Sequence, residues 1–197
     1  TIHCLGLGLA TRNAKNEIIE VYYPQPLLNP DTALSSLLLA SCAIQSAENS
    51  VTQIDGKLAS ALASKLLEAK FAKHAEQVQQ MNEGQGQLIL CVLFTDSAPK
   101  SVAEAYLKLH LLSHRLCKPH SLNLDGLFAV LHNLAWTNEG AIDLEELPAR
   151  QMAARLAGAT LEVASVDKFP KMTSYVVPAG VRIAHTARVR LGAYLGA

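Results

Sequence analysis

The sequence predicts a globular part of mixed α/β (α+β) class, followed by the first coil of a parallel β-helix. As far as residue 165, short runs rich in β-branched residues alternate with segments of helical periodicity. From Val177 to Ala197 the chain instead divides into six-residue units, VPAGVR, IAHTAR and VRLGAY, with the fragment LGA at the end. We therefore expect an α/β N-terminal domain over residues 1–165, and a linker with the first coil over residues 166–197.

The composition limits the class of protein. Half of the 197 residues are hydrophobic, which is enough for a sizeable core. The 17 Lys and Arg residues balance the 17 Asp and Glu residues, so no basic face for nucleic acid is expected. No apolar run approaches the roughly 20 residues that cross a bilayer, and the N-terminus lacks a basic stretch before an apolar one. We expect a cytoplasmic protein without nucleic-acid or membrane partners.

The first elements read as a β-hairpin. The runs His3–Ala10 and Glu17–Tyr23 are β-rich and are separated by a polar turn. Gly6 and Gly8 form a G-x-G pair, but a third glycine and an apolar helix are missing, so dinucleotide binding is not favoured. Glycines inside a strand more often mark a bulge or a close approach of another group.

Two helices and a buried strand are expected next. Asp31 can cap a helix that extends to about Ser46. A longer helix is expected from about Gly56 to Met81, because apolar residues recur along one face. The run Leu88–Phe94 is apolar without alternation, which is typical of a strand covered on both faces.

The clearest helix spans Pro99–Cys117, where Ser101 and Glu104 form a capping box. A short apolar run at Leu127–Leu131 follows.

A second capping box then predicts another helix. It is formed by Asp143 and Glu146, and the helix is expected to end at Gly158. Thr160–Val166 alternates between apolar and polar residues and is expected to be the last strand of the globular part.

The six-residue units near the C-terminus are typical of a parallel β-helix. Six-residue spacing fits neither the 3.6 period of a helix nor the 2.0 period of a strand. One coil cannot bury its own inward side chains, so we expect the main body of a larger protein to follow. The alternative is an ordinary edge strand with chance spacing. The aliphatic residues that open the units are Val177, Ile183, Val189 and Leu195.

One cluster has the residue types of a metal site. His110 and His114 are four apart on a predicted helix, with Cys117 and His120 just beyond it. This spacing places both imidazoles on one face, as a zinc site requires. No Glu follows the first His as in H-E-x-x-H, and we favour packed histidines over a zinc site. No serine has the G-x-S-x-G surroundings of a hydrolase nucleophile.

The densest basic cluster lies around the predicted coil. Arg182 and Arg188 are six apart and share one position of the repeat, so a β-helix would place them in a ladder. Guanidinium groups so arranged suit carboxylates or phosphates. The alternative is a solvated or subunit-bridging edge. The cluster also contains Arg190, Lys168 and Lys171.

Three segments carry a resemblance to a known family: AEAYLKLHLLSHRLCKPHSLNLDGLF (Ala103–Phe128), AWTN (Ala135–Asn138) and SVDKFPKMTSYVVPAGVRIAHTARVRLGAYLG (Ser165–Gly196), with a looser match at YYPQPLL (Tyr22–Leu28). They resemble the tetrahydrodipicolinate N-succinyltransferase family, in its branch with a long N-terminal domain. The resemblance implies a left-handed parallel β-helix after the α/β domain and a homotrimer of the full-length protein. It implies transfer of succinyl from succinyl-CoA, the cosubstrate, to tetrahydrodipicolinate in the diaminopimelate route to lysine.

The resemblance also limits what this piece can do. The glutamate proposed for catalysis in the family lies in a later coil, so we assign no catalytic residue, expect no bound cofactor and expect the fragment alone to be inactive. Some relatives carry an Asp of a magnesium site where this chain has Ala187, so no metal ligand is assigned. Lys168, Arg188 and Arg190 are candidates for binding the carboxylates of the acceptor, because they flank the first coil where a neighbouring subunit would approach.

Two alternatives remain. The globular part could be a non-catalytic oligomerisation and capping module, because an uncovered first coil exposes strand edges. A zinc-dependent hexapeptide enzyme would need three histidines on the coils, and only His185 is present.

Overall fold

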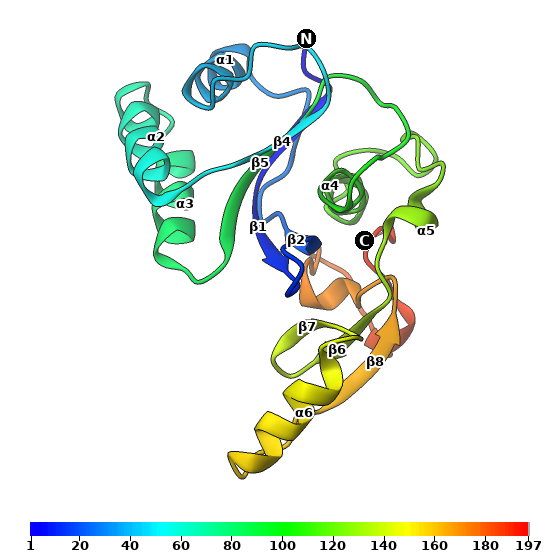
Figure 1. Cartoon of the computed structure of the whole chain (residues 1–197). Helices are drawn as coiled ribbons and strands as arrows, with labels where there is room; N and C mark the ends of the chain where they lie inside the picture. The colour runs from blue at the N-terminus through cyan, green and yellow to red at the C-terminus, as the bar shows by residue number, and fades with distance from the viewer. Residues whose placement is uncertain (197) are drawn as a thin grey trace.

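The computed structural model describes residues 1–196 as two sheets with helices packed around them (Figure 1). The first sheet contains β1 (Cys4–Arg12), β2 (Ile18–Tyr22), β3 (Leu27–Leu28), β4 (Ser50–Gln53) and β5 (Gln87–Leu93). The second contains β6 (Leu134–Thr137), β7 (Gly140–Asp143) and β8 (Val163–Asp167). The helices are α1 (Thr32–Ser41), α2 (Gly56–Glu68), α3 (Ala72–Glu83), α4 (Val102–Ser113), α5 (Leu127–Val130) and α6 (Leu147–Leu156). Across residues 1–196, every helix is too short or too polar to cross a membrane.

The first sheet is antiparallel throughout and is covered on both faces. Its strand order is β2-β1-β5-β4, and β3 pairs with the start of β1. Helices α1, α2 and α3 pack on one face, where they meet Leu5 and Leu7, and α4 packs on the other, where it meets Cys4 and Ala10 (Figure 1). The predicted mixed α/β class is confirmed, with antiparallel rather than parallel strands.

The predicted hairpin is confirmed, and its glycines serve close packing. Strands β1 and β2 pair from Leu9 to Arg12. A Cβ atom on Gly8 would lie 2.6 Å from Cε1 of Tyr23, and one on Gly6 would lie 2.7 Å from Cδ1 of the same ring. The ring of Tyr23 therefore lies directly against the backbone of β1, so the G-x-G pair is a packing feature and not a phosphate loop.

The prediction of a single helix from Gly56 to Met81 is wrong, because the structure has two helices, α2 and α3, in this segment. Lys70 takes a positive φ of 67°, and the N–H of Phe71 donates to the carbonyl of Leu66 at 2.8 Å. This bond closes a Schellman motif with lysine in the place usually held by glycine. The helix after Asp31 also ends earlier than expected, at Ser41, and β4 was not predicted.

The predictions for α4 and α6 differ in accuracy. Ser101 caps α4 and accepts from the N–H of Glu104, as the capping box requires. The box at Asp143 is wrong, because Asp143 ends β7 and its side chain accepts from the N–H of Glu145 instead. Helix α6 begins at Leu147 and is followed by Gly158 at a φ of 75°, as expected.

Residues 177–196 form turns and one 3₁₀ turn (Thr186–Arg188) rather than strands. The one ladder contact in this tail joins Lys171 to Arg190. Three of the four repeat-opening side chains still pack against the α4 core, whereas Val177 is 65% exposed. The coil is therefore not formed as strands within the described residues, and its last residue, Ala197, lies outside them. The predicted boundary between residues 165 and 166 falls inside β8 and stays a prediction.

Candidate functional site

The three predicted binding residues do not converge on one site. Lys168 donates to the carbonyl of Phe128 at 2.8 Å, and its Nζ lies 4.7 Å from the centre of that ring. Arg190 pairs with Asp167 at 3.1 Å. Arg188 ends the 3₁₀ turn, is exposed, and makes no ion pair with the residues that the structure describes. Of the three, Arg188 presents the guanidinium that is open to a ligand.

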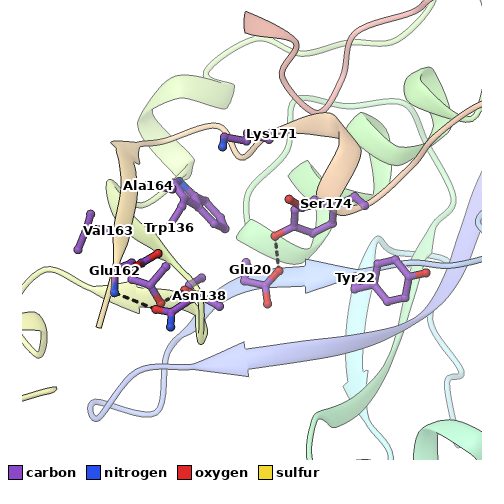
Figure 2. A pocket seen from close by; sticks show the side chains of 13 residues that line it. Glu20, Tyr22, Trp136, Asn138, Glu162, Val163, Ala164, Lys171 and Ser174 are labelled. Atoms are coloured by element: carbon purple, nitrogen blue, oxygen red, sulfur yellow. Dashed lines mark hydrogen bonds between the residues drawn. The ribbon is translucent and has the colours of Figure 1, made fainter. Parts of the chain in front are cut away.

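A cavity of about 740 Å³ lies elsewhere, between the edge of the first sheet and the second sheet. Strand β2, the β6–β7 hairpin, the start of β8 and the segment 171–175 form its walls (Figure 2). None of the three predicted residues lines it. Its polar and aromatic lining includes Glu20, Tyr22, Trp136, Asn138, Glu162, Lys171, Ser174 and Tyr175.

Glu20 is the most perturbed charged group in this cavity. Its half-buried carboxylate accepts hydrogen bonds from the hydroxyls of Thr11 and Tyr175. Burial raises the pKa of Glu20, although the two hydroxyl donors oppose this shift. Sequence reasoning missed this residue. The signal was one acidic residue in the middle of the apolar run EIIEVYY.

Two side-chain hydrogen bonds fix the wall of the cavity that lies opposite Glu20. The indole Nε1–H of Trp136 donates to the carbonyl of Asp167 at 2.9 Å. The Asn138 side chain accepts from the N–H of Glu162 at 2.9 Å (Figure 2). These bonds orient the tryptophan ring and hold the turn after β6 beside β8, so this wall is preformed.

The histidine cluster is structural. His110 is buried, its Nδ1–H donates to the carbonyl of Tyr106 at 2.7 Å, and its Nε2 accepts from the N–H of Tyr23 at 3.2 Å. Both nitrogens are used, which fixes one neutral tautomer and leaves no lone pair for a metal. Burial lowers the pKa of His110 to about 3. Among residues 1–196, no three His, Cys, Asp or Glu side chains are grouped to hold a metal.

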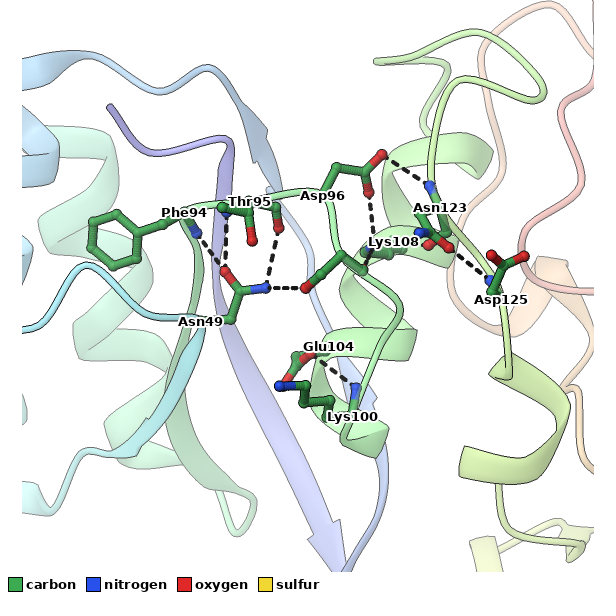
Figure 3. A network of polar contacts seen from close by, with 10 residues as sticks. Asn49, Phe94, Thr95, Asp96, Lys100, Glu104, Lys108, Asn123 and Asp125 are labelled. Atoms are coloured by element: carbon green, nitrogen blue, oxygen red, sulfur yellow. Dashed lines mark hydrogen bonds and ion pairs between the residues drawn. The ribbon is translucent and has the colours of Figure 1, made fainter.

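A second buried polar cluster surrounds Lys108 on α4 (Figure 3). Its Nζ donates to Asp96 at 2.6 Å and to the carbonyl of Asn123 at 2.7 Å, and it also donates to the carbonyl of Ser97. All three ammonium protons are therefore used. Asp96 also accepts from the N–H of Asn123 at 2.9 Å. The cluster joins the loop after β5 to the segment before α5 and has no free group for chemistry.

Two family models match this chain. The model of the tetrahydrodipicolinate N-succinyltransferase N-terminal domain matches residues 66–129, and the model of the middle domain matches residues 131–171. Together they account for more than half of the chain. The chain belongs to the tetrahydrodipicolinate N-succinyltransferase family. The resemblance inferred from the sequence is thereby confirmed.

Curated relatives in this succinyltransferase family match almost the whole chain. A protein of Vibrio cholerae named 2,3,4,5-tetrahydropyridine-2,6-dicarboxylate N-succinyltransferase is 50% identical over 192 residues, 98% of this chain and 56% of the relative. A protein of Pseudomonas aeruginosa with the same name is 50% identical over 196 residues, 100% of this chain and 56% of the relative. The chain thus spans about half the length of the curated relatives it matches.

A solved structure supports the fold. A crystal structure of a Campylobacter jejuni protein, provisionally named a 2,3,4,5-tetrahydropyridine-2-carboxylate N-succinyltransferase, superposes with a TM-score of 0.85. The match covers 96% of this chain and 54% of that one, at 24% identity. At this identity the likeness bears on the fold alone.

Proposed function

We propose that this chain is the N-terminal part of an acyltransferase that moves succinyl from succinyl-CoA to the amino group of tetrahydrodipicolinate, in the diaminopimelate route to lysine. The observation that carries the proposal is the 50% identity, across nearly the whole chain, to relatives with this activity in their name. In the reaction, water first adds to the C=N bond of the tetrahydrodipicolinate ring, which converts the ring nitrogen to an amine. The neutral amine then attacks the thioester carbonyl, a C–N bond forms, the C–S bond breaks, and the amine proton leaves with the thiol of CoA.

Within this piece, the proposed role is to bind the carboxylates of the acceptor. Arg188 is the first candidate because its guanidinium is exposed and unpaired among the described residues. Lys168 and Arg190 are secondary candidates, because each would have to leave the contact that it makes with Phe128 or Asp167. We assign the acyl-transfer step, any cofactor and any metal to the part of the relatives' sequences that this chain does not match.

We further propose that residues 166–197 become the first coil of a left-handed parallel β-helix in a cytoplasmic homotrimer. Ile183, Val189 and Leu195 already turn toward the core, which supports an inward role for the repeat-opening residues. A coil without a neighbour lacks half of its core, which accounts for the absence of strands in residues 177–196.

A chimera tests this function. Residues 1–196 would replace the matching residues of the Vibrio cholerae relative, and release of the CoA thiol would be followed with succinyl-CoA and tetrahydrodipicolinate. We expect turnover in the chimera and none in this chain alone. A folded chimera that retains the trimeric state of its parent but shows no turnover would contradict the proposal.

The role of Arg188 is tested in the same chimera. Arg188→Ala should raise the KM for the acceptor by about tenfold, as expected for a lost charge-assisted bond, and leave the KM for succinyl-CoA unchanged. Arg155→Ala is the matched control, because Arg155 is also exposed but lies on α6, outside the basic cluster. An unchanged acceptor KM removes Arg188 from the site.

One observation favours a second function, in which the globular part is an oligomerisation and capping module for the β-helix. The end of α4 holds the tail, since Ser113 donates to the carbonyl of Ala193 at 3.1 Å and accepts from the N–H of Gly192 at 2.8 Å. Arg115 donates to the carbonyl of Ala179 at 3.0 Å. The Vibrio cholerae relative without the residues that match 1–165 separates the two roles: a pure cap predicts a weaker trimer with turnover retained.

A further inference from the structure

Three charged side chains line the cavity beside β2, namely Glu20, the exposed Glu162 and Lys171, and none of them makes an ion pair with a described residue. The carboxylate of Glu20 accepts from two neutral hydroxyls but has no cation within ion-pair distance among residues 1–196. A half-buried carboxylate in this position has lost part of its hydration without gaining an opposite charge. The cavity therefore favours a ligand that brings a cation to Glu20.

Lys171 supplies the opposite charge on another wall of the same cavity (Figure 2). No hydrogen bond or ion pair joins its ammonium group to any described residue. Lys171 and Glu20 do not pair with each other either, so their charged atoms lie beyond ion-pair distance. A molecule bound between them that carries both a cation and an anion would form an ion pair with each of the two side chains.

Three aromatic residues, Tyr22, Trp136 and Tyr175, also line the cavity. Tyr22 and Tyr175 lie with ring centroids 6.3 Å apart, and the hydrogen bond from Trp136 to the Asp167 carbonyl fixes the indole. Aromatic faces attract ammonium groups and also accept short aliphatic segments. The lining thus matches a small organic molecule with an ammonium group, a short carbon chain and an acid group.

We propose that this cavity binds a small amino acid or ω-amino acid, with its ammonium at Glu20 against the aromatic rings and its carboxylate at Lys171. The site is separate from the proposed acceptor site, because Lys168, Arg188 and Arg190 are not part of its lining. An experiment that disproves binding at this cavity would therefore leave the proposed acyl-transfer function untouched, and the reverse also holds.

Calorimetric titration of the 197-residue chain tests the proposal. The probes are glycine, γ-aminobutyrate and ε-aminocaproate, compared with hexylamine and hexanoate, which each carry one of the two charges. We expect saturable binding of at least one of the doubly charged probes, and about tenfold weaker binding or none for the singly charged ones. Absence of binding by all three doubly charged probes up to about 10 mM would overturn the proposal.

Two variants locate the binding. Lys171→Met and Glu20→Gln should each weaken the binding of the best probe by about tenfold, because each removes one charge pair. Lys65→Met and Glu68→Gln are matched controls on the exposed face of α2 and should leave it unchanged. The Lys171 side chain makes no hydrogen bond or ion pair with the described residues, so Lys171→Met tests the site even if Glu20→Gln perturbs folding. Binding to Lys171→Met as tight as to the unaltered chain would refute the site.

Discussion

The two sheets of this molecule are stabilised in different ways. The first is enclosed by two large apolar clusters, one against α1–α3 and one against α4. The second has only Ala135, Ile142 and Leu161 as buried hydrophobic residues in its own cluster. Its helix α6 buries no residue within the described chain, and Leu156 is 81% exposed. Apolar burial is the main stabilising term in folding, so the second sheet is expected to be the less stable region.

Polar contacts from the first sheet compensate in part. The turn between β1 and β2 reaches the start of α6: Asn13 donates to Asp143 at 2.9 Å, and the N–H of Ala14 donates to Glu146 at 2.6 Å. Lys15 pairs with Glu145 at 2.7 Å on the surface. The stability of the second sheet therefore depends on its contacts with the first, whereas the first sheet is stabilised mainly by its own apolar clusters.

The largest effect is expected from Lys108→Met in the first region. Removing the ammonium leaves Asp96 and two carbonyls without their partner, which should cost about 3–5 kcal/mol of unfolding free energy. Urea unfolding followed by circular dichroism measures it. Lys65→Met, an exposed change of the same type, should have little effect. A loss below about 1 kcal/mol would show that the buried cation is dispensable.

Gly8→Ala should be the next most damaging change. The added methyl group would contact the ring of Tyr23 and the side chain of Val21 at less than van der Waals distance, and overpacking of this kind costs up to about 3 kcal/mol. Gly56→Ala is the control, because its Cβ would meet only Asn82 at 3.4 Å in the first turn of α2. The control should be neutral or stabilising in the same urea measurement. Equal losses in both variants would argue against close packing at β1.

A pH dependence is expected from His110. Its pKa is about 3 in the folded chain and near its ordinary value of 6.5 when unfolded, so the unfolded chain takes up the proton first as the pH falls. The stabilisation is complete above pH 6.5 and is lost toward pH 3, at about 1.4 kcal/mol per pH unit. Between pH 7 and pH 5 we expect a loss of about 2 kcal/mol.

The variant His110→Gln isolates this dependence, because it removes the titrating group. The unfolding free energy should then vary less with pH, whatever its absolute value. Glu20 acts in the opposite sense, because its raised pKa favours the folded state at low pH, and it is present in both proteins. An identical pH profile in the two proteins would contradict the assignment.

The smallest effects concern the contact between the two regions. Asn13→Ala should cost about 1 kcal/mol and speed hydrogen exchange in β7 and α6 more than in β5, because the lost bond to Asp143 connects the second sheet to the first. Lys15→Ala removes only an exposed ion pair and should leave exchange unchanged. Uniform acceleration across both sheets would instead indicate one cooperative unit.

Local signals explain which elements could be predicted. The capping box of α4 and the apolar run of β5 are encoded within the elements themselves, and both were found. The break at Lys70 was missed because a non-glycine residue takes the left-handed conformation there. Strands β4 and β7 are short edge strands whose order depends on a neighbour, so their sequences carry little signal.

The cavity could not be predicted for a similar reason. Its lining joins β2, the β6–β7 hairpin, β8 and the segment near Lys171, which lie far apart in the sequence. The sequence identified Lys171 as part of a basic cluster but gave no indication that Glu20 would share its cavity. Both the family and the basic segment were found from the sequence, because their motifs are contiguous.

The last turn of α4 fixes the position of the backbone at Gly192 and Ala193. The Ser113 hydroxyl accepts a hydrogen bond from the N–H of Gly192. Gly192 has a φ of 100°, and a Cβ added to it would lie 2.5 Å from Cδ2 of Leu109, so there is no room for a side chain at this position. Residues 193–196 therefore follow a backbone position that is held in place by α4. Replacing Gly192 by a residue with a side chain should therefore displace the segment 190–196 from the end of α4.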